Sequence, residues 1–113
     1  MSSAAFEAIT SGPRPYQNKI VSAEAAADLI HDGDTIATGG LIGIGFAEEV
    51  VIAIEQRFLK TGSPSGLSLI YAGGQGDGKT RGLNHFGHPG MLRRVIGGHW
   101  GLVPRLQQLA VGN

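Results

Sequence analysis

Apolar residues occur along the chain in two kinds of pattern, which predict helices alternating with strands. Ala47, Val51, Ile54 and Phe58 recur at three- and four-residue spacing and predict one face of a helix. Short unbroken apolar runs, by contrast, are typical of buried strands. In chain order the patterns predict a helix from Ser22 to the break at 32–34, a strand at 35–38, a helix from 46 or 47 to the break at 62–66, a strand at 67–72, a short helix after Pro89, a strand at 94–97 and a helix at 104–110.

The first helix has clear local signals at both ends. Ser22 is a suitable N-cap because its hydroxyl can accept a hydrogen bond from a free amide of the first turn. Gly33, in the segment 32–34, can adopt the left-handed conformation that ends many helices. The residues expected on its apolar face are Ala25, Ala26, Leu29 and Ile30.

The alternation of helices and strands implies an open α/β fold with a parallel sheet. Three strands are too few to bury both faces of such a sheet, so the fold is expected to be incomplete. Residues 1–18 are small and polar and include Gly12–Pro15, which predicts a flexible arm before a folded part at 19–113.

Composition narrows the functional classes. The chain has 113 residues and formal net charge +0, which gives no support for nucleic-acid binding or for attraction to an anionic membrane. It has no cysteine, so disulfides and thiolate chemistry are excluded. No apolar run is long enough to span a membrane and no secretory signal opens the chain, so a cytoplasmic location is expected.

Glycine is the outlying residue type, with 19 copies. Glycine-rich loops follow all three predicted strands, at 39–45, 73–87 and 97–101. Because the carboxyl ends of parallel strands share one edge, these loops should meet there and present main-chain amides to an oxyanion or a carboxylate. The alternative for the first loop is that its glycines serve only turn geometry, since their spacing does not fit the dinucleotide pattern.

The second loop contains a match to a phosphate-binding motif. Residues 73–80, GGQGDGKT, fit the P-loop pattern at every position and follow a strand. A P-loop must open directly into a helix, and the next segment, 81–90, contains three glycines and a proline. No later strand ends in an aspartate that could hold magnesium. A P-loop nucleotide-binding protein is retained as an alternative.

Histidines and glutamates give no catalytic or metal assignment. His85, His88 and His99 lack an acidic residue nearby in the sequence that would complete a metal site, and ordinary hydrogen bonds are expected for them. Glu48 and Glu49 fall in the first turn of a helix, where negative charge complements the helix dipole. We therefore predict no metal ligand and no catalytic residue in this chain.

Residues 32–47, DGDTIATGGLIGIGFA, resemble the N-terminal motif of the family I coenzyme A transferases. Leu41 stands where that family usually has Phe, and Ala47 where it usually has Pro. The resemblance continues through 70–78, 81–86 and 94–102, and it covers about 19–110. The acetate/propionate and short-chain acyl branch of the family is the most similar.

The resemblance implies a reaction in which a glutamate attacks an acyl-CoA thioester, a glutamyl-CoA thioester forms, and a carboxylate such as acetate collects the CoA. It implies coenzyme A as a substrate, no cofactor, and homo-oligomers at full length. The family's nucleophile lies in its C-terminal half, so this chain alone is expected to be inactive and to need that missing half as a partner. A non-catalytic acyl-CoA binding module remains a further alternative. The resemblance assigns substrate binding to Gly39, Gly40, Gly43, Gly45, Ala72, Gly73, Gly74, Gln75 and Gly76.

Overall fold

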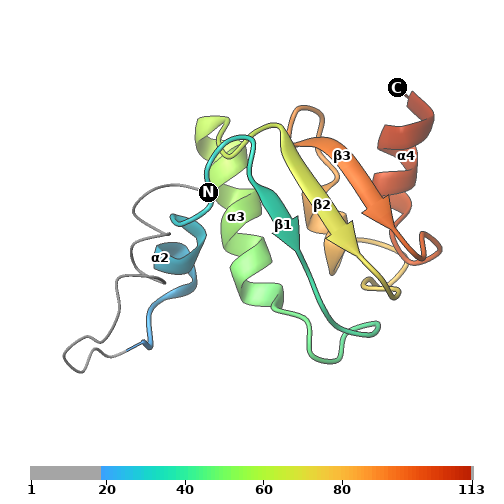
Figure 1. Ribbon diagram of the computed structural model, residues 1–113, viewed down its shortest axis with the longest axis horizontal. Helices are drawn as coiled ribbons and strands as arrows, with labels where there is room; N and C mark the ends of the chain where they lie inside the picture. The colour runs from blue at the N-terminus through green and yellow to red at the C-terminus, as the bar shows by residue number, and fades with distance from the viewer. Residues whose placement is uncertain (1–18, 113) are drawn as a thin grey trace.

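The computed structural model describes residues 19–112, and the predicted arm at 1–18 lies outside this range. Helices and strands alternate along the chain, as the sequence predicts (Figure 1). No helix in the described range is long and apolar enough to cross a bilayer. The elements are α2 (Ala23–Ala27), β1 (Thr35–Ala37), α3 (Glu48–Thr61), β2 (Leu67–Tyr71), the 3-10 helix η1 (Leu83–Phe86), β3 (Leu92–Gly97) and α4 (Pro104–Gly112).

The three strands form one parallel sheet in the order β1-β2-β3. Leu69 in the central strand pairs with Ile36 of β1 and Val95 of β3. A register irregularity lies between Leu67 and Ser68, where β3 contains an extra residue relative to β2. The predicted parallel α/β sheet is thereby confirmed.

Within residues 19–112, only one face of the sheet is covered. Along β2, Leu67, Leu69 and Tyr71 are buried beneath α3 and η1, because alternate side chains of a strand point to the same face. Ile70 points to the opposite face and is 42% exposed, and Ile96 of β3 is 48% exposed. In Figure 1, α3 lies behind the sheet and no described helix crosses in front of it. The fold is therefore incomplete, as predicted.

The difference between the two faces can be tested with one substitution at two positions. Ile54 of α3 is 3% exposed, so Ile54→Val should lower the free energy of unfolding by about 1 kcal/mol. Ile70→Val should change the free energy of unfolding by only about a few tenths of a kcal/mol, because the Ile70 side chain is already partly exposed to water. Urea unfolding of the full chain gives both values, and equal losses would mean that both faces are covered.

The first helix is shorter than predicted. It ends at Ala27, which is buried, whereas Leu29 is 53% exposed and Ala25 is also exposed. The Arg57 guanidinium of α3 donates to the carbonyls of Ala27 at 2.9 Å and of Ile30 at 2.7 Å. The Ala27 carbonyl also accepts from the Ile30 amide at 3.0 Å in a tight last turn, and the distant Arg57 side chain takes the place of a continued helix. The Ser22 N-cap is confirmed, since its hydroxyl accepts from the Ala25 amide at 3.1 Å.

The short helix predicted after Pro89 is also wrong. The helical turn lies earlier, at η1, and Gly90 with φ +88° turns the chain directly into β3. Backbone bonds from Gly66 to Gly90 and from Leu67 to Met91 then align β3 beside β2. The third strand therefore begins at Leu92, two residues before the predicted start.

Candidate functional site at the glycine-loop edge

The three glycine-rich loops meet at the carboxyl edge of the sheet. The Ile42 amide donates to the Gly74 carbonyl at 2.6 Å, which joins the first loop to the second. The Gly98 amide donates to the Tyr71 carbonyl at 3.1 Å, which joins the third loop to the end of β2. A Cβ atom at Gly98 would overlap the Ala72 carbonyl oxygen, so this approach requires glycine. The predicted convergence of the loops is confirmed.

Main-chain donors at this edge are unused within residues 19–112. The loop hydrogen bonds of that range employ the amides of Leu41, Ile42 and Ile44, but none employs an amide of the residues predicted to bind substrate. In the first loop these unpaired amides lie on mostly exposed backbone, while those at 74–76 are buried. Paired peptide groups are the rule inside proteins, so free donors at one edge indicate a surface suited to an anionic or carbonyl oxygen.

Two unpaired polar side-chain atoms lie where the first two loops meet. Gln75 is 1% exposed, and its Nε2 atom is 3.5 Å from the carbonyls of Thr38 and Gly73. Its Oε1 atom is buried without a partner in the described part of the chain, and so is the Thr38 hydroxyl. The sequence pointed to Gln75 but missed Thr38. The only sequence signal for Thr38 is its position as the last residue before Gly39.

Residues 73–80, which match the P-loop pattern, do not form a P-loop in the structure. Asp77 Oδ1 accepts hydrogen bonds from the amides of Lys79, Thr80 and Arg81 at 2.8, 2.8 and 3.0 Å. The bond from Arg81, with those from Lys79 and Thr80, lowers the pKa of the Asp77 carboxyl. A P-loop would offer such amides to phosphate, but here the chain's own carboxylate occupies them. The segment after Thr80 leads to the 3-10 helix η1 and not to an α-helix.

This arrangement predicts a local effect of Asp77→Ala. Removing the carboxylate leaves the amides of 79–81 without acceptors, so their hydrogen exchange should become faster. Amide hydrogen exchange in β2 should not change, because residues 77–81 are exposed and do not pack in the core. Glu49→Ala, an exposed change on α3, is the matched control. Unchanged exchange at 79–81 would show that Asp77 does not organise this loop.

Comparison with known proteins finds CoA-transferases that are similar to this chain. No family model matches it. It is 36% identical over 83 residues to a caffeate CoA-transferase of Acetobacterium woodii, and 33% identical over 95 residues to the acetate CoA-transferase YdiF of Escherichia coli K12. These matches cover 74% and 83% of this chain.

Solved structures agree in fold. The E. coli O157:H7 acyl-CoA transferase YdiF, in its thioester complex with CoA, superimposes with a TM-score of 0.80 at 33% identity over 82% of this chain. Over most of its length the chain is thus similar to a segment of CoA-transferases, in agreement with its resemblance to family I. It spans 16% and 18% of the length of the curated relatives and 19% of the solved CoA-transferase.

A network of histidines and glutamates connects the second loop to α3. The two ring nitrogens of His85 lie 2.8 Å from Glu55 Oε1 and 2.6 Å from Glu48 Oε1. His88 Nε2 lies 2.6 Å from Glu55 Oε2. Each ring nitrogen of His85 therefore faces a carboxylate oxygen, and the ring links Glu48 to Glu55.

The hydrogen bonds expected for His85 and His88 are therefore present, and the fold brings to them two glutamates that lie far away in the sequence. Glu48 and Glu55 are seven residues apart, which places them two turns apart on one face of α3. Glu48 also accepts from the Gly82 amide at 3.1 Å and lies 3.7 Å from Arg81 Nε, so it does more than complement the helix dipole. Within 19–112 no group of three or more such side chains is arranged to hold a metal ion. The network instead holds the second loop in place.

Proposed function

We propose that this chain provides the acyl-binding wall of a transferase that moves CoA between a short-chain acyl-CoA and a carboxylate such as acetate. A glutamate outside the described loops would attack the thioester carbonyl. The CoA thiolate leaves, and a mixed anhydride remains. The thiolate then attacks the glutamyl carbonyl, the first acyl group leaves as a carboxylate, and a glutamyl-CoA thioester remains. The acceptor carboxylate reverses these steps and leaves as its CoA ester.

The observation that supports this role is the set of unused donors where the first and second loops meet. Each attack on a carbonyl converts its oxygen to an oxyanion, and fixed peptide N–H groups stabilise that charge without reorganising. The amides of Gly39, Gly40, Gly43 and Gly45 supply the first part of the wall, and those of 72–76 supply the second. Because the chain covers about a fifth of the solved enzyme, we propose that the rest of a transferase supplies the attacking glutamate.

The test uses a chimera in which this chain replaces the matched segment of E. coli YdiF. The chimera should transfer CoA from propionyl-CoA to acetate, whereas the 113-residue chain alone should not. Gly40→Ala should lower kcat/KM roughly 100-fold, because its Cβ would lie 3.0 Å from the Ile44 carbonyl and 3.1 Å from the Phe46 nitrogen. Gly112→Ala, at the end of α4, is the control, because its Cβ would meet no atom within 4 Å.

Four results would contradict the proposal. An inactive but folded chimera, or equal losses for the two glycine variants, would remove the acyl-binding role. Saturable acyl-CoA binding by the isolated chain, with no turnover in the chimera, would favour the non-catalytic binding module. Binding of ATP and Mg²⁺ that disappears in Lys79→Ala would favour the P-loop alternative.

A further inference from the structure

We propose that His99, in the third glycine-rich loop, binds the acceptor carboxylate by donating a hydrogen bond from its imidazole. The inference rests on the proposed function, because it assigns a donor to the second substrate of that same site. The proposed reaction brings the attacking glutamate and the acceptor carboxylate close together. Their like charges repel, so the acceptor carboxylate needs a donor that holds it in place. In this role His99 forms no covalent bond and transfers no proton.

The imidazole of His99 lies against the second loop. A Cβ atom added at Gly74 would lie 3.0 Å from Nδ1 of His99 and 3.6 Å from its Cε1. Gly74 is one of the residues predicted to bind substrate, and its carbonyl accepts from the Ile42 amide of the first loop at 2.6 Å. The three loops therefore meet at Gly74, where the third loop contributes the side chain of His99.

A second glycine leaves room for the same ring. A Cβ atom added at Gly101 would lie 2.9 Å from Cε1 of His99 and 3.4 Å from its Nε2, and the three nearest atoms all belong to this imidazole. Non-bonded carbon atoms are in optimal contact at about 3.5–4.0 Å. Neither glycine could carry a methyl group without moving the ring. The imidazole thus fills the space between two glycines of different loops.

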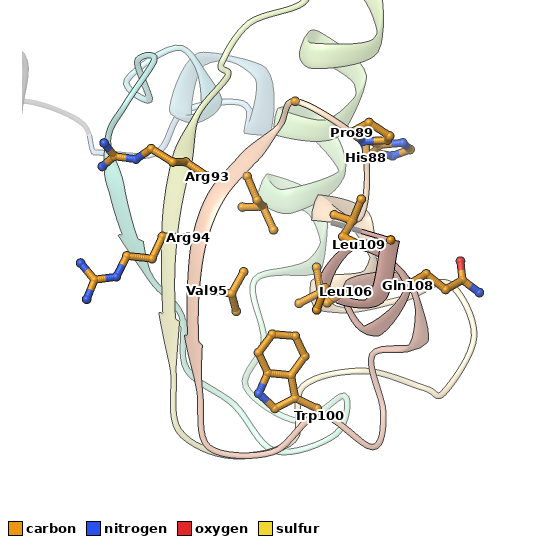
Figure 2. Close-up of a pocket in the computed structure, with 13 residues that line it drawn as sticks. His88, Pro89, Arg93, Arg94, Val95, Trp100, Leu106, Gln108 and Leu109 are labelled. Atoms are coloured by element: carbon orange, nitrogen blue, oxygen red, sulfur yellow. The ribbon is translucent and has the colours of Figure 1, made fainter.

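The backbone on both sides of His99 is held in place. The Gly98 amide donates to the Tyr71 carbonyl at 3.1 Å, and the indole nitrogen of Trp100 donates to the Gly97 carbonyl at 3.1 Å. Trp100 lines the pocket between β3 and α4 (Figure 2), and its ring centroid lies 6.4 Å from that of Tyr71. A side chain on a fixed backbone can bind a ligand at little cost in conformational entropy, which favours a binding role.

Within residues 19–112, the imidazole of His99 has no hydrogen-bond partner. The rings of His31, His85 and His88 all contact oxygen atoms of other residues. An imidazole carries at least one N–H donor in either protonation state, and His99 is exposed. Its donor is therefore open to a substrate at the glycine-loop edge.

The donors at this edge are of two kinds. Residues 38–46 and 72–76 contain no charged side chain, so their donors are neutral groups, mostly main-chain amides. Fixed amides suit the oxyanion that develops at the attacked carbonyl. A carboxylate has a second oxygen and forms strong, charge-assisted hydrogen bonds with side-chain donors. Because His99 supplies the titratable side chain that packs on Gly74, it fits the acceptor carboxylate.

The test is steady-state kinetics of the chimera with E. coli YdiF, with propionyl-CoA and acetate as substrates. His99→Phe keeps a flat ring and removes both nitrogens, so it should raise KM for acetate roughly tenfold and change KM for propionyl-CoA less than about twofold. His99→Asn retains an N–H near the position of Nδ1 and should restore most of the loss. His31→Phe is the matched control, because His31 is exposed and precedes β1, at the opposite edge of the sheet.

Gly101→Ala provides an independent variant, because it displaces the imidazole and leaves His99 in the chain. The atoms that its Cβ would meet belong to a side chain that can swing away, so the fold should be preserved. KM for acetate should rise as it does in His99→Phe. The double variant should resemble His99→Phe alone, because the donor is already absent.

An unchanged KM for acetate in His99→Phe would overturn the proposal, as would equal increases in KM for both substrates. If the unmodified chimera does not turn over, the transferase role fails, and NMR of the 113-residue chain decides the carboxylate site. Sodium acetate should then shift the ring resonances of His99 to saturation, whereas sodium chloride should not. The absence of a saturable shift would overturn the carboxylate site, and its presence would support that site without the transferase role.

Discussion

Gly82→Ala should lower the free energy of unfolding by about 3–4 kcal/mol, combining left-handed strain with overpacking. Gly82 has φ +69° and ψ −137°, a combination that residues with a Cβ rarely adopt. An added Cβ would overlap the Gln75 carbonyl oxygen and lie 2.7 Å from Gly76 Cα. Both neighbours are backbone atoms of the second loop, so no flexible side chain can move away. A domain of this size is stabilised by about 5–15 kcal/mol, so the loss is a large fraction of the total.

Gly78→Ala separates backbone strain from steric overlap. Gly78 has φ +76°, but a Cβ there meets no atom within 4 Å, so only the conformational strain applies. We expect Gly78→Ala to lower stability by about 1 kcal/mol. Urea unfolding followed by Trp100 fluorescence measures both variants. Equal midpoints for the two would show that the close approach of Gly82 to Gln75 does not stabilise the second loop.

Local sequence signals predicted the sheet well because strands in this chain are short apolar runs bounded by glycine. The run 67–72 and the breaks on either side of it required no knowledge of distant contacts. The convergence of the loops followed from one geometric fact, that parallel strands share their carboxyl edge. That reasoning could identify Gln75 as a loop residue. It could not show that the Gln75 side chain is buried against the carbonyl of Thr38.

The predictions from sequence failed where contacts join residues that lie far apart in the sequence. The end of α2 depends on Arg57, which lies 30 residues beyond the Ala27 carbonyl that it binds. The environment of His85 depends on α3, since its partners Glu48 and Glu55 lie 37 and 30 residues away. Neither contact produces a periodic sequence pattern within a single helix or strand. The sequence could at most have shown that Glu48 and Glu55 share a helix face.

Glu55→Ala should lower the free energy of unfolding by about 3 kcal/mol, because it removes the carboxylate of His88 and one of the two carboxylates of His85 in a mostly buried setting. The side chains of Glu55 and His85 are each 13% exposed, and that of His88 is 22% exposed. Glu48 and Arg81 border the same cluster. Losing Glu55 should therefore also loosen the second loop, visible as faster hydrogen exchange at 83–88.

The same network should make stability depend on pH. Burial alone would raise the pKa of Glu55, but the hydrogen bonds from His88 and His85 outweigh it and lower that pKa. A carboxyl whose pKa is lower in the folded state binds fewer protons there than in the unfolded state. Its stabilisation is present above the unfolded pKa of about 4.3 and is lost as the pH falls through the folded pKa. Unfolding of the full chain should therefore become easier below about pH 5.

Glu55→Gln tests this linkage because it keeps the shape of the side chain and removes its titration. Urea midpoints measured from about pH 7 to 3 should fall less steeply for Glu55→Gln than for the unmodified chain. Glu49→Gln, on an exposed position of the same helix, should follow the unmodified chain. If all three curves run parallel, the acid sensitivity comes from other carboxyls. In that case the contacts of Glu55 with His85 and His88 stabilise the second loop by packing and not by charge.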